Sequence, residues 1–156
     1  MRRPLAISAL GLVVMLWAGA LVAAPVSGAS HLSAAVYAAG SVVCHQRADR
    51  SFQLGNAQLP VCARCTGLYA GAIAGVFGWA VIAGVRARPT QRAERLTGWP
   101  RLRGALVVIA TPTLITVVTA SAGIWDPANA ARALLAVPLG AVITGVVVAV
   151  AAGDLR

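Results

Sequence analysis

The sequence predicts an all-α, polytopic membrane protein with four transmembrane helices and a short outward-facing Cys/His loop between the first two. Of its 156 residues, 59% are hydrophobic and 11% are charged, and the mean hydropathy of +0.81 is well above that of soluble domains. Four apolar segments reach the length of about 20 residues that a bilayer-spanning helix needs. They are residues 5–24, 66–85, 104–123 and 133–152, and none contains a charged residue. These continuous runs lack the alternation of membrane-barrel strands, so we expect one integral membrane domain without strands.

The first segment has two interpretations. Arg2 and Arg3 precede an apolar run that ends in Ala-Ala-Pro, a pattern also typical of a secretory signal peptide. The run of about 20 residues is long for a cleaved signal, whose apolar core is typically about 7–15 residues. We therefore favour an uncleaved anchor. Cleavage would leave three spans and would not change the side that the cysteines face.

The loop between the first two spans, residues 41–65, follows an Ala-rich stretch at 31–40 that is too short to span and predicts an interfacial or re-entrant helix. Gly55 and Pro60 punctuate the polar part of the loop and predict a compact, irregular segment. Cys65 then lies at the mouth of the second span, with Thr66 as a candidate N-cap. The partial positive charge of a helix N-terminus lowers the pKa of a thiol, and Arg64 acts in the same direction.

The arginines predict the orientation. The chain contains 13 basic residues, and most lie at its start, in the loop 86–103 and at Arg156. Because basic residues near span ends favour the cytoplasmic side, we expect a multi-pass protein of the plasma membrane with both termini in the cytoplasm. The cysteine loop and the turn around Asp126 then face outward. The net charge of +9 is divided among loops, which argues against nucleic-acid binding.

The cysteines favour a metal site. Cys44, His45, Cys62 and Cys65 offer three thiolates and an imidazole, a ligand set that suits tetrahedral zinc. The odd number of cysteines also favours a metal, because simple pairing leaves one thiol over. Copper(I) is a second candidate, since it too prefers soft ligands. His31 is a more distant candidate for a further ligand.

Two other interpretations remain open, and with them the question of whether the protein is an enzyme. Cys62 and Cys65, with Arg64 between them at the mouth of a helix, resemble the thiol pair of quinone-linked disulfide-generating membrane proteins and vitamin K epoxide reductases. That resemblance implies a thiol–disulfide oxidoreductase with a quinone between the helices, although Cys44 has no partner for a second relay pair. The other interpretation is a structural disulfide, Cys62–Cys65 or Cys44–Cys62, that holds the loop.

Further polar residues are expected around the site. Asp126, Asn129 and Arg132 belong to the second outward turn, where Asn129 and Arg132 share a helix face by their i,i+3 spacing. Arg132 stands near the start of an apolar span, where an unpaired guanidinium is costly. We expect Arg64, Tyr69, Asp126, Asn129 and Arg132 to surround the cysteines or to contribute ligands.

The spans themselves are rich in small residues. Gly67, Gly71 and Gly75 repeat every fourth position in the second span, a pattern that allows another helix to approach closely. The neighbouring helix can belong to the same chain or to a second copy in a homo-oligomer. Pro112 and Pro138 lie inside the third and fourth spans and are expected to kink them.

One motif string resembles a known family. Cys44-His45-Gln46, Arg50-Ser51-Phe52, Gly55 and the string from Pro60 to Gly71 are similar to a family of small prokaryotic membrane proteins catalogued as domain of unknown function 2085. The resemblance runs from about Val43 to Gly140. The family tends to carry an Asp and then an Asn-x-x-Arg entering the last span, which Asp126, Asn129 and Arg132 resemble. The resemblance implies the architecture and the location of the site, but no reaction.

Overall fold

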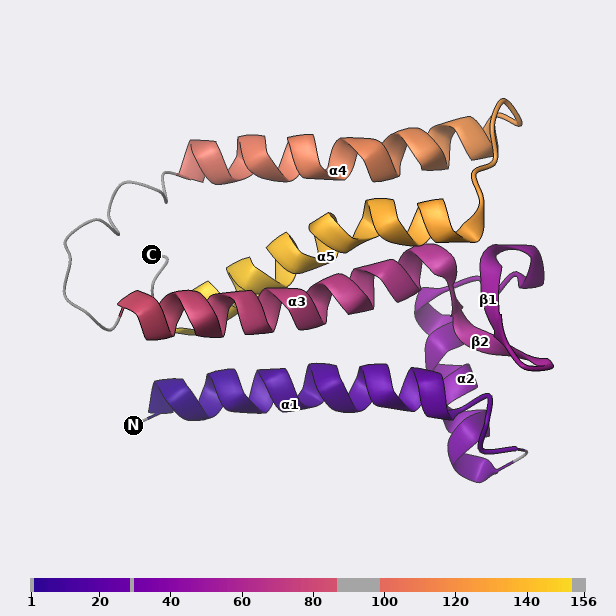
Figure 1. The fold of residues 1–156 in the computed structure, drawn as a ribbon, viewed down its shortest axis with the longest axis horizontal. Coiled ribbons are helices and arrows are strands. Elements are labelled where there is room, and N and C mark those ends of the chain that lie inside the picture. Colours follow the sequence, from indigo (N-terminus) through magenta and orange to yellow (C-terminus); the bar gives the residue numbers. More distant parts are fainter. Residues whose placement is uncertain (1, 29, 87–98, 153–156) are drawn as a thin grey trace.

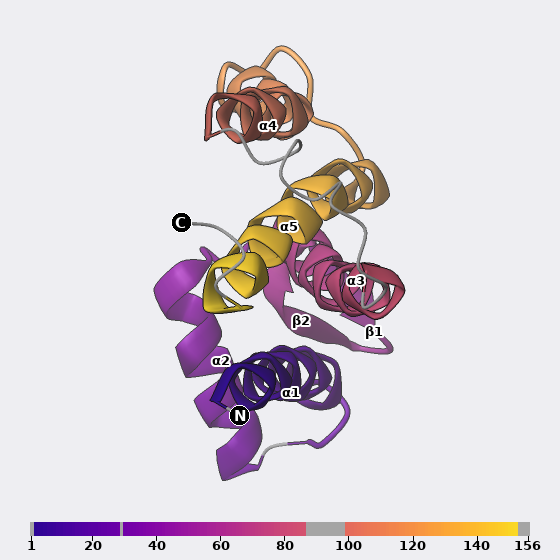
Figure 2. The same ribbon diagram turned by 90° about the vertical axis from the view of Figure 1, so that its left-hand side faces the viewer.

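The protein is built from long helices that run side by side, with the cysteine-bearing segments gathered at one end (Figure 1). The structure is a computed structural model that describes residues 2–28, 30–86 and 99–152. The long helices are α1 (Arg2–Ala23), α3 (Ala63–Arg86), α4 (Trp99–Ser121) and α5 (Asn129–Ala152). Viewed along their axes, α5 lies between α3 and α4, and α1 lies on the other side of α3 (Figure 2). Each of the four predicted apolar segments falls largely within one of these helices.

A short helix and a β-hairpin connect α1 to α3. The helix α2 (His31–Val43) confirms the helix predicted at 31–40 and extends three residues beyond it. A single 3₁₀ turn, η1 (Ala48–Arg50), then leads into β1 (Ser51–Leu54) and β2 (Ala57–Cys62). These elements close the end of the bundle at which α3 begins (Figure 1).

The hairpin contradicts the prediction of an all-α fold without strands. β1 and β2 pair antiparallel, with Leu54 opposite Ala57, so that Gly55 and Asn56 form a two-residue turn. Gly55 has a φ of +62°, and Asn56 is not among the residues with positive φ. This is the pattern of a type II′ turn, whose twist matches that of paired strands. Gly55 is typical of an irregular loop, but a Gly-Asn pair between short runs of alternating polarity also indicates a hairpin, and that signal outweighs the loop interpretation here.

The prediction of four transmembrane helices is also wrong. Within the described residues, two helices are long and apolar enough to cross a membrane, Arg103–Ser121 of α4 and Asn129–Ala151 of α5. Within the described residues of α1, the apolar stretch is Ile7–Ala23, which is shorter than a span requires. Over its own described residues, α3 is not among the helices that qualify. The described part of the chain therefore supports two candidate spans in place of the four predicted.

Small residues bring α3 and α5 together, and these two helices form the most extensive helix pair. A Cβ atom added at Gly67, Gly71 or Gly75 would meet the α5 backbone at Ala133, Val137 or Ala141, respectively. Gly140 of α5 faces the backbone of Leu68 in the same way. The predicted glycine face therefore packs within the chain. A homo-oligomer through this face stays a prediction.

The end of the bundle opposite the hairpin is where the first helix, α1, starts and the last helix, α5, finishes (Figure 1). The predicted Arg-rich loop lies largely outside the described residues, as does Arg156. Pro112 and Pro138 lie inside α4 and α5, as predicted.

Candidate metal and thiol site

Cys44 is the residue at which α2 ends. Its backbone is extended, with φ −145° and ψ 138°, and its N–H donates to the carbonyl of Gly40 at 3.0 Å. Its side chain is buried in an apolar cluster with Leu21, Val36 and Val61. Gly40 allows α2 to lie against β2, because a Cβ there would stand 2.6 Å from the Pro60 carbonyl oxygen. Helix termination thus carries the Cys44 sulfur into the interior.

Cys62 and Cys65 flank the junction of β2 with α3. Cys62 is the last residue of β2, and α3 begins at Ala63, so that Cys65 lies in its first turn. The prediction of Thr66 as the N-cap is wrong, because α3 starts three residues before it, at Ala63. The Thr66 hydroxyl instead donates to the Cys62 carbonyl at 3.2 Å. The junction places both thiols beside the free backbone N–H groups of a helix N-terminus.

The three thiols converge. The Sγ atoms of Cys44, Cys62 and Cys65 all lie within 4.8 Å of one another, and no disulfide joins them. The Cys62 backbone N–H donates to the Cys44 Sγ at 3.1 Å, which compensates negative charge on that sulfur. The site thus draws one thiol from each of α2, β2 and α3.

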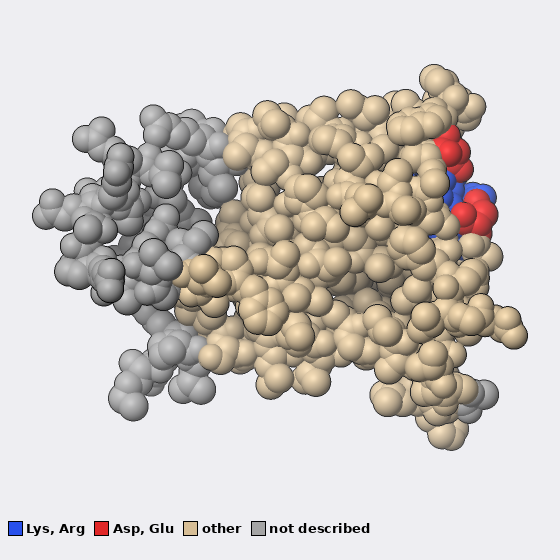
Figure 3. Space-filling model, viewed as in Figure 1, with Lys and Arg blue, Asp and Glu red and all other residues tan. Residues whose placement is uncertain are grey.

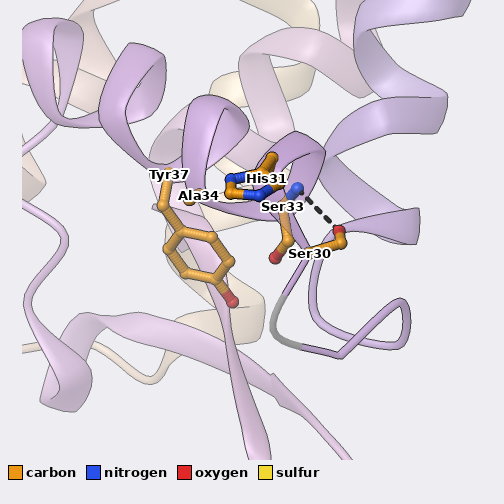
Figure 4. A pocket seen from close by; sticks show the side chains of 5 residues that line it. All are labelled: Ser30, His31, Ser33, Ala34 and Tyr37. Carbon is orange, nitrogen blue, oxygen red and sulfur yellow. Dashed lines mark hydrogen bonds between the residues drawn. The ribbon is translucent and has the colours of Figure 1, made fainter.

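The predicted histidine ligands lie elsewhere. His45 is exposed and is not part of the group of ligand atoms formed by the cysteines. His31 lines an open pocket of about 320 Å³ beside the start of α2, together with Ser30, Ser33, Ala34 and Tyr37 (Figure 4). There the Ser33 N–H donates to the Ser30 hydroxyl at 3.1 Å and caps the helix. The role of His45 as a fourth ligand stays a prediction.

Cys62 and Cys65 differ in their acidity. A hydrogen bond from the Cys65 thiol lowers the pKa of Cys62, and the backbone N–H groups of Cys65 and Arg64 add to this effect against the opposing effect of burial. The pKa of Cys65 is raised, because its proton is held by the Cys62 sulfur and because the group is partly buried. Cys62 is therefore the more acidic thiol of the pair.

Gln46 organises the backbone around the cysteines. It has a φ of +48°, a left-handed conformation that is uncommon outside glycine. Its Nε2 donates to the carbonyls of Tyr37 and Pro60, each at 2.7 Å. Gln58 donates to the Gln46 carbonyl at 2.6 Å, and the Tyr37 hydroxyl donates to the Gln58 carbonyl. This network connects α2, which precedes Cys44, and Gln46, which follows it, to the part of β2 that precedes Cys62.

An apolar pocket lies beside the thiols. It has a volume of about 140 Å³ and is lined by residues of α1, β2 and α3, among them Leu21, Val61, Thr66 and Tyr69. Leu21 and Val61 also pack in the cluster that buries Cys44. Tyr69 packs edge-on against Trp17 of α1, with ring centroids 6.3 Å apart. Of the predicted surrounding residues, Tyr69 therefore belongs to the thiol side of the site.

The other predicted residues, Arg64, Asp126, Asn129 and Arg132, lie near Arg50 and Asp49, to which no site role was assigned. We define the arginine cluster as Arg50, Arg64 and Arg132 with the carboxylates of Asp49 and Asp126. Arg132 donates to Asp126 and, at 2.9 Å, to the Asn129 side-chain oxygen. Arg64 donates to the Thr116 carbonyl of α4 at 2.7 Å. The cluster lies at the same end of the bundle as the hairpin, where the charged side chains visible in Figure 3 gather.

The arginine cluster connects the cysteine loop to the turn around Asp126, the two segments that we predicted to face outward. Arg50 lies 3.7 Å from Asp126, and Asn129 donates to the Ser51 carbonyl at 3.1 Å. The hydrogen bond from Arg132 holds the pKa of Asp126 below its usual value. Burial and the charges of Arg132 and Arg50 lower the pKa of Arg64. The structure therefore brings Asp126, Asn129 and Arg132 together with Arg50 and Arg64.

Sequence reasoning assigned no role to Gln46, Tyr37, Gln58 or Thr116. Only Gln46 offered a signal, because it belongs to the motif string that begins at Cys44. The carbonyl acceptors that these side chains use depend on how α2, β2 and α4 pack. That packing is not visible in the local sequence.

Comparison with known proteins relates most of the chain to one family. The chain is 42% identical over 45 residues to an uncharacterised protein of Methanocaldococcus jannaschii, a match that spans 29% of this chain and 29% of that relative. No solved structure matches the chain significantly. A family described as "Predicted membrane protein (DUF2085)" matches residues 44–149. This match begins at Cys44 and includes all the cysteines and the arginine cluster, and the chain therefore belongs to this family of predicted membrane proteins.

Proposed function

We propose that the protein binds a metal ion through Cys44, Cys62 and Cys65, and that zinc is the metal the site suits best. The observation that carries the proposal is the convergence of three free thiols to within 4.8 Å. Zinc–sulfur bonds of about 2.3 Å place tetrahedral thiolates roughly 3.8 Å apart, so the three sulfurs need to contract only slightly. Copper(I), which also prefers thiolates, is the second choice.

The surroundings of the sulfurs support the proposal. Cys44 is 6% exposed and already accepts a backbone N–H, as metal-bound thiolates do. Cys62 is the more acidic thiol of its pair, which favours loss of its proton to a metal. The elements that carry the cysteines are held by the Gln46 network, so the ligands are preorganised before a metal binds.

The fourth coordination position distinguishes two kinds of zinc site. If the His45 ring turns inward, it completes a closed, structural site. If His45 stays exposed, water or a substrate takes the fourth position, as in catalytic zinc sites. Three thiolates alone suit copper(I). The nature of the fourth ligand therefore decides whether the site supports a reaction.

Cobalt(II) titration tests the proposal, because the intensity of the sulfur-to-cobalt charge-transfer band reports the number of thiolate ligands. We expect one equivalent to bind to the wild type with a band typical of three thiolates. Cys44→Ser should lose about one third of this intensity and bind more weakly. His45→Ala should leave the charge-transfer band unchanged and alter the visible bands only if His45 is a ligand. A cobalt spectrum without a charge-transfer band would contradict the proposal.

A thiol–disulfide oxidoreductase is the second candidate, favoured by the opposite pKa directions of Cys62 and Cys65. A thiolate beside a protonated thiol is the arrangement of a reactive pair. Oxidation of this thiolate–thiol pair to a disulfide releases two electrons and one proton, and a quinone that accepts them takes a second proton from water to become a quinol. The adjoining 140 Å³ pocket is close to the volume of about 150 Å³ that accommodates a benzene ring.

Cys44→Ser separates the two candidates. Under the metal proposal the variant loses most of its bound metal. Under the redox proposal the Cys62–Cys65 pair still cycles with a water-soluble quinone, since Cys44 takes no part in the disulfide. A variant that keeps its metal and cannot cycle would contradict both.

For the membrane, we propose that the cysteine end of the bundle faces outward and that both chain termini are cytoplasmic. The two candidate spans support this proposal, because α4 begins and α5 ends at the end of the bundle opposite the hairpin. The basic residues of 86–103 lie directly before, or at the start of, the first of these spans in the sequence. The positive-inside rule assigns the end at which this span begins to the cytoplasm.

A further inference from the structure

Three guanidinium groups from three distant segments meet in the arginine cluster. Arg50 belongs to η1, Arg64 to the first turn of α3, and Arg132 to the first turn of α5. Arg132 is almost fully buried, with 3% of its surface exposed. The Nε atom of each arginine is buried and has no hydrogen-bond partner among the described residues. Buried donors without partners are rare in native proteins, and a bound ion is one explanation for them.

The carboxylates nearby do not satisfy these donors. Asp49 and Asp126 approach Arg50 only to 3.7 Å, which is too long for a hydrogen bond. Asp126 is engaged by Arg132, and Asp49 is paired with the exposed Arg47 at 3.0 Å. Arg64 donates to a neutral carbonyl and makes no ion pair with a described carboxylate. The cluster therefore holds three guanidinium groups against two carboxylates, with the Cys62 sulfur as a further negative charge near Arg64. The buried Nε donors remain without an acceptor in the part of the chain that the structure describes, which is costly in a partly buried place.

We propose that the arginine cluster binds a tetrahedral oxyanion of the phosphate type, whose oxygens accept hydrogen bonds from Arg50, Arg64 and Arg132. Guanidinium groups that approach from three segments suit an anion with oxygens on several sides better than a planar carboxylate with two. Arginine is also the side chain that most often recognises phosphate through paired N–H donors. The same chemistry fits inorganic phosphate and the phosphate monoester headgroup of a lipid, whereas the phosphodiester of phosphatidylcholine has fewer free oxygens.

The exposed side of the cluster provides an entry route. Arg50 is 26% exposed and Asp126 50% exposed at their side chains, and their 3.7 Å contact is loose enough for an anion to replace it. Arg132 then forms the base of the site and Arg64 one wall. The site lies beside the cysteines, because Arg64 stands between Cys62 and Cys65 in the chain. It does not depend on a bound metal.

The test is a titration of the full-length protein, in nanodiscs of phosphatidylcholine at low salt, with inorganic phosphate followed by calorimetry. The wild type should bind with saturation at one site per chain. Arg64→Gln should weaken binding by about tenfold or more, since it removes a charged donor. Arg50→Gln, at a more exposed position, provides a second variant if Arg64→Gln does not fold. Arg47→Gln is the matched control, because it removes the same charge from an exposed neighbour and should change affinity less than about twofold.

A second titration with phosphatidic acid added to the nanodiscs distinguishes the sources of the phosphate group. Binding of phosphatidic acid but not of inorganic phosphate, with the same dependence on Arg64, supports the proposal with a lipid as the ligand. The proposal is overturned if neither binds, or if Arg47→Gln weakens binding as much as Arg64→Gln. Cys44→Ser should bind phosphate as the wild type does, so the loss of metal and the loss of the anion are separate results.

Discussion

Gln46 shows how a residue without any reactive group controls the site. Its left-handed backbone turns the chain immediately after Cys44-His45, and its amide connects the Tyr37 and Pro60 carbonyls. Both acceptors are partly buried, and loss of their donor leaves them unsatisfied. The position of Cys44 relative to Cys62 therefore depends on a glutamine that contacts neither sulfur.

Replacement of this glutamine should loosen the site. We expect Gln46→Ala to lower the free energy of unfolding by about 1–3 kcal/mol, because it removes two hydrogen bonds. Gln46→Gly should be about 1 kcal/mol less destabilised than Gln46→Ala, since glycine adopts the positive φ without strain. Denaturant titration in detergent measures both. The exposed Gln53→Ala is the control, and equal stability of Gln46→Ala and Gln53→Ala would refute the role of the network.

Asp126 should make stability depend on acid pH. Its pKa is lowered in the folded protein by the hydrogen bond from Arg132, so its contribution is present above the unfolded pKa near 4 and lost as the pH falls through the folded pKa. We expect Asp126→Asn to remove this part of the acid dependence, measured as unfolding free energy between about pH 5 and pH 2. Asp49→Asn should leave the contribution of Asp126 in place. An acid profile unchanged by Asp126→Asn would show that its ion pair does not contribute.

The sequence alone singled out the three cysteines whose thiols converge, because so few other side chains in this chain carry chemistry. It did not identify which thiol of the pair becomes the thiolate. We expected the helix start to favour Cys65, whereas hydrogen bonds to the sulfur place the lowered pKa at Cys62. Those bonds depend on three segments meeting in space.

At the scale of elements, the packing of α3 on α5 positions the cysteines relative to the arginine cluster. Arg64 and Cys65 begin α3, and Arg132 begins α5, so the separation of these two helices sets the distance between the two sites. The glycine face allows that close approach. Its pattern in the sequence correctly predicted close helix packing.

A matched pair of substitutions on α3 tests this packing. Gly71→Ala should destabilise the protein by about 1–3 kcal/mol, because its Cβ would overlap the α5 backbone at Val137. Gly78→Ala has no neighbour within 4 Å and should be neutral or stabilise the helix by up to about 1 kcal/mol. Thermal unfolding in the same detergent compares the two variants. Equal melting temperatures for the pair would show that the glycine face does not set the helix separation.

The hairpin is the element that the sequence composition did not predict. Its β1 strand has four residues, too few for a clear periodicity, and its turn residues are equally common in irregular loops. The start of α3 was placed late for a similar reason, since apolar content rises only after Thr66 while the helix already begins at Ala63. Apolar runs predict where helices lie, but caps and tertiary contacts decide where they start.

For the whole molecule, the distribution of side chains matches a membrane environment. Large apolar residues are exposed on the outward faces of α1 and α4, such as Leu16 at 64% and Val108 at 71%. The charged side chains visible in Figure 3 are confined to the end that carries the hairpin. Exposed apolar surface on this scale is typical of contact with lipid.

The orientation can be measured with fusions at the end of the chain. We expect green fluorescent protein joined after Arg156 to be fluorescent in bacteria, and alkaline phosphatase joined at the same position to be inactive. This result follows from the positive-inside rule applied to the segment 86–103. An active phosphatase fusion with a dark fluorescent-protein fusion would reverse the proposed orientation.

Elemental analysis of the protein purified from membranes, combined with thiol counting in denaturant and chelator, tests the central proposal most directly. We predict about one zinc or copper ion per chain and three thiols that react with a mass-tagged reagent. Absence of metal together with a single reactive thiol would mean that two cysteines form a disulfide. That result would contradict the metal site.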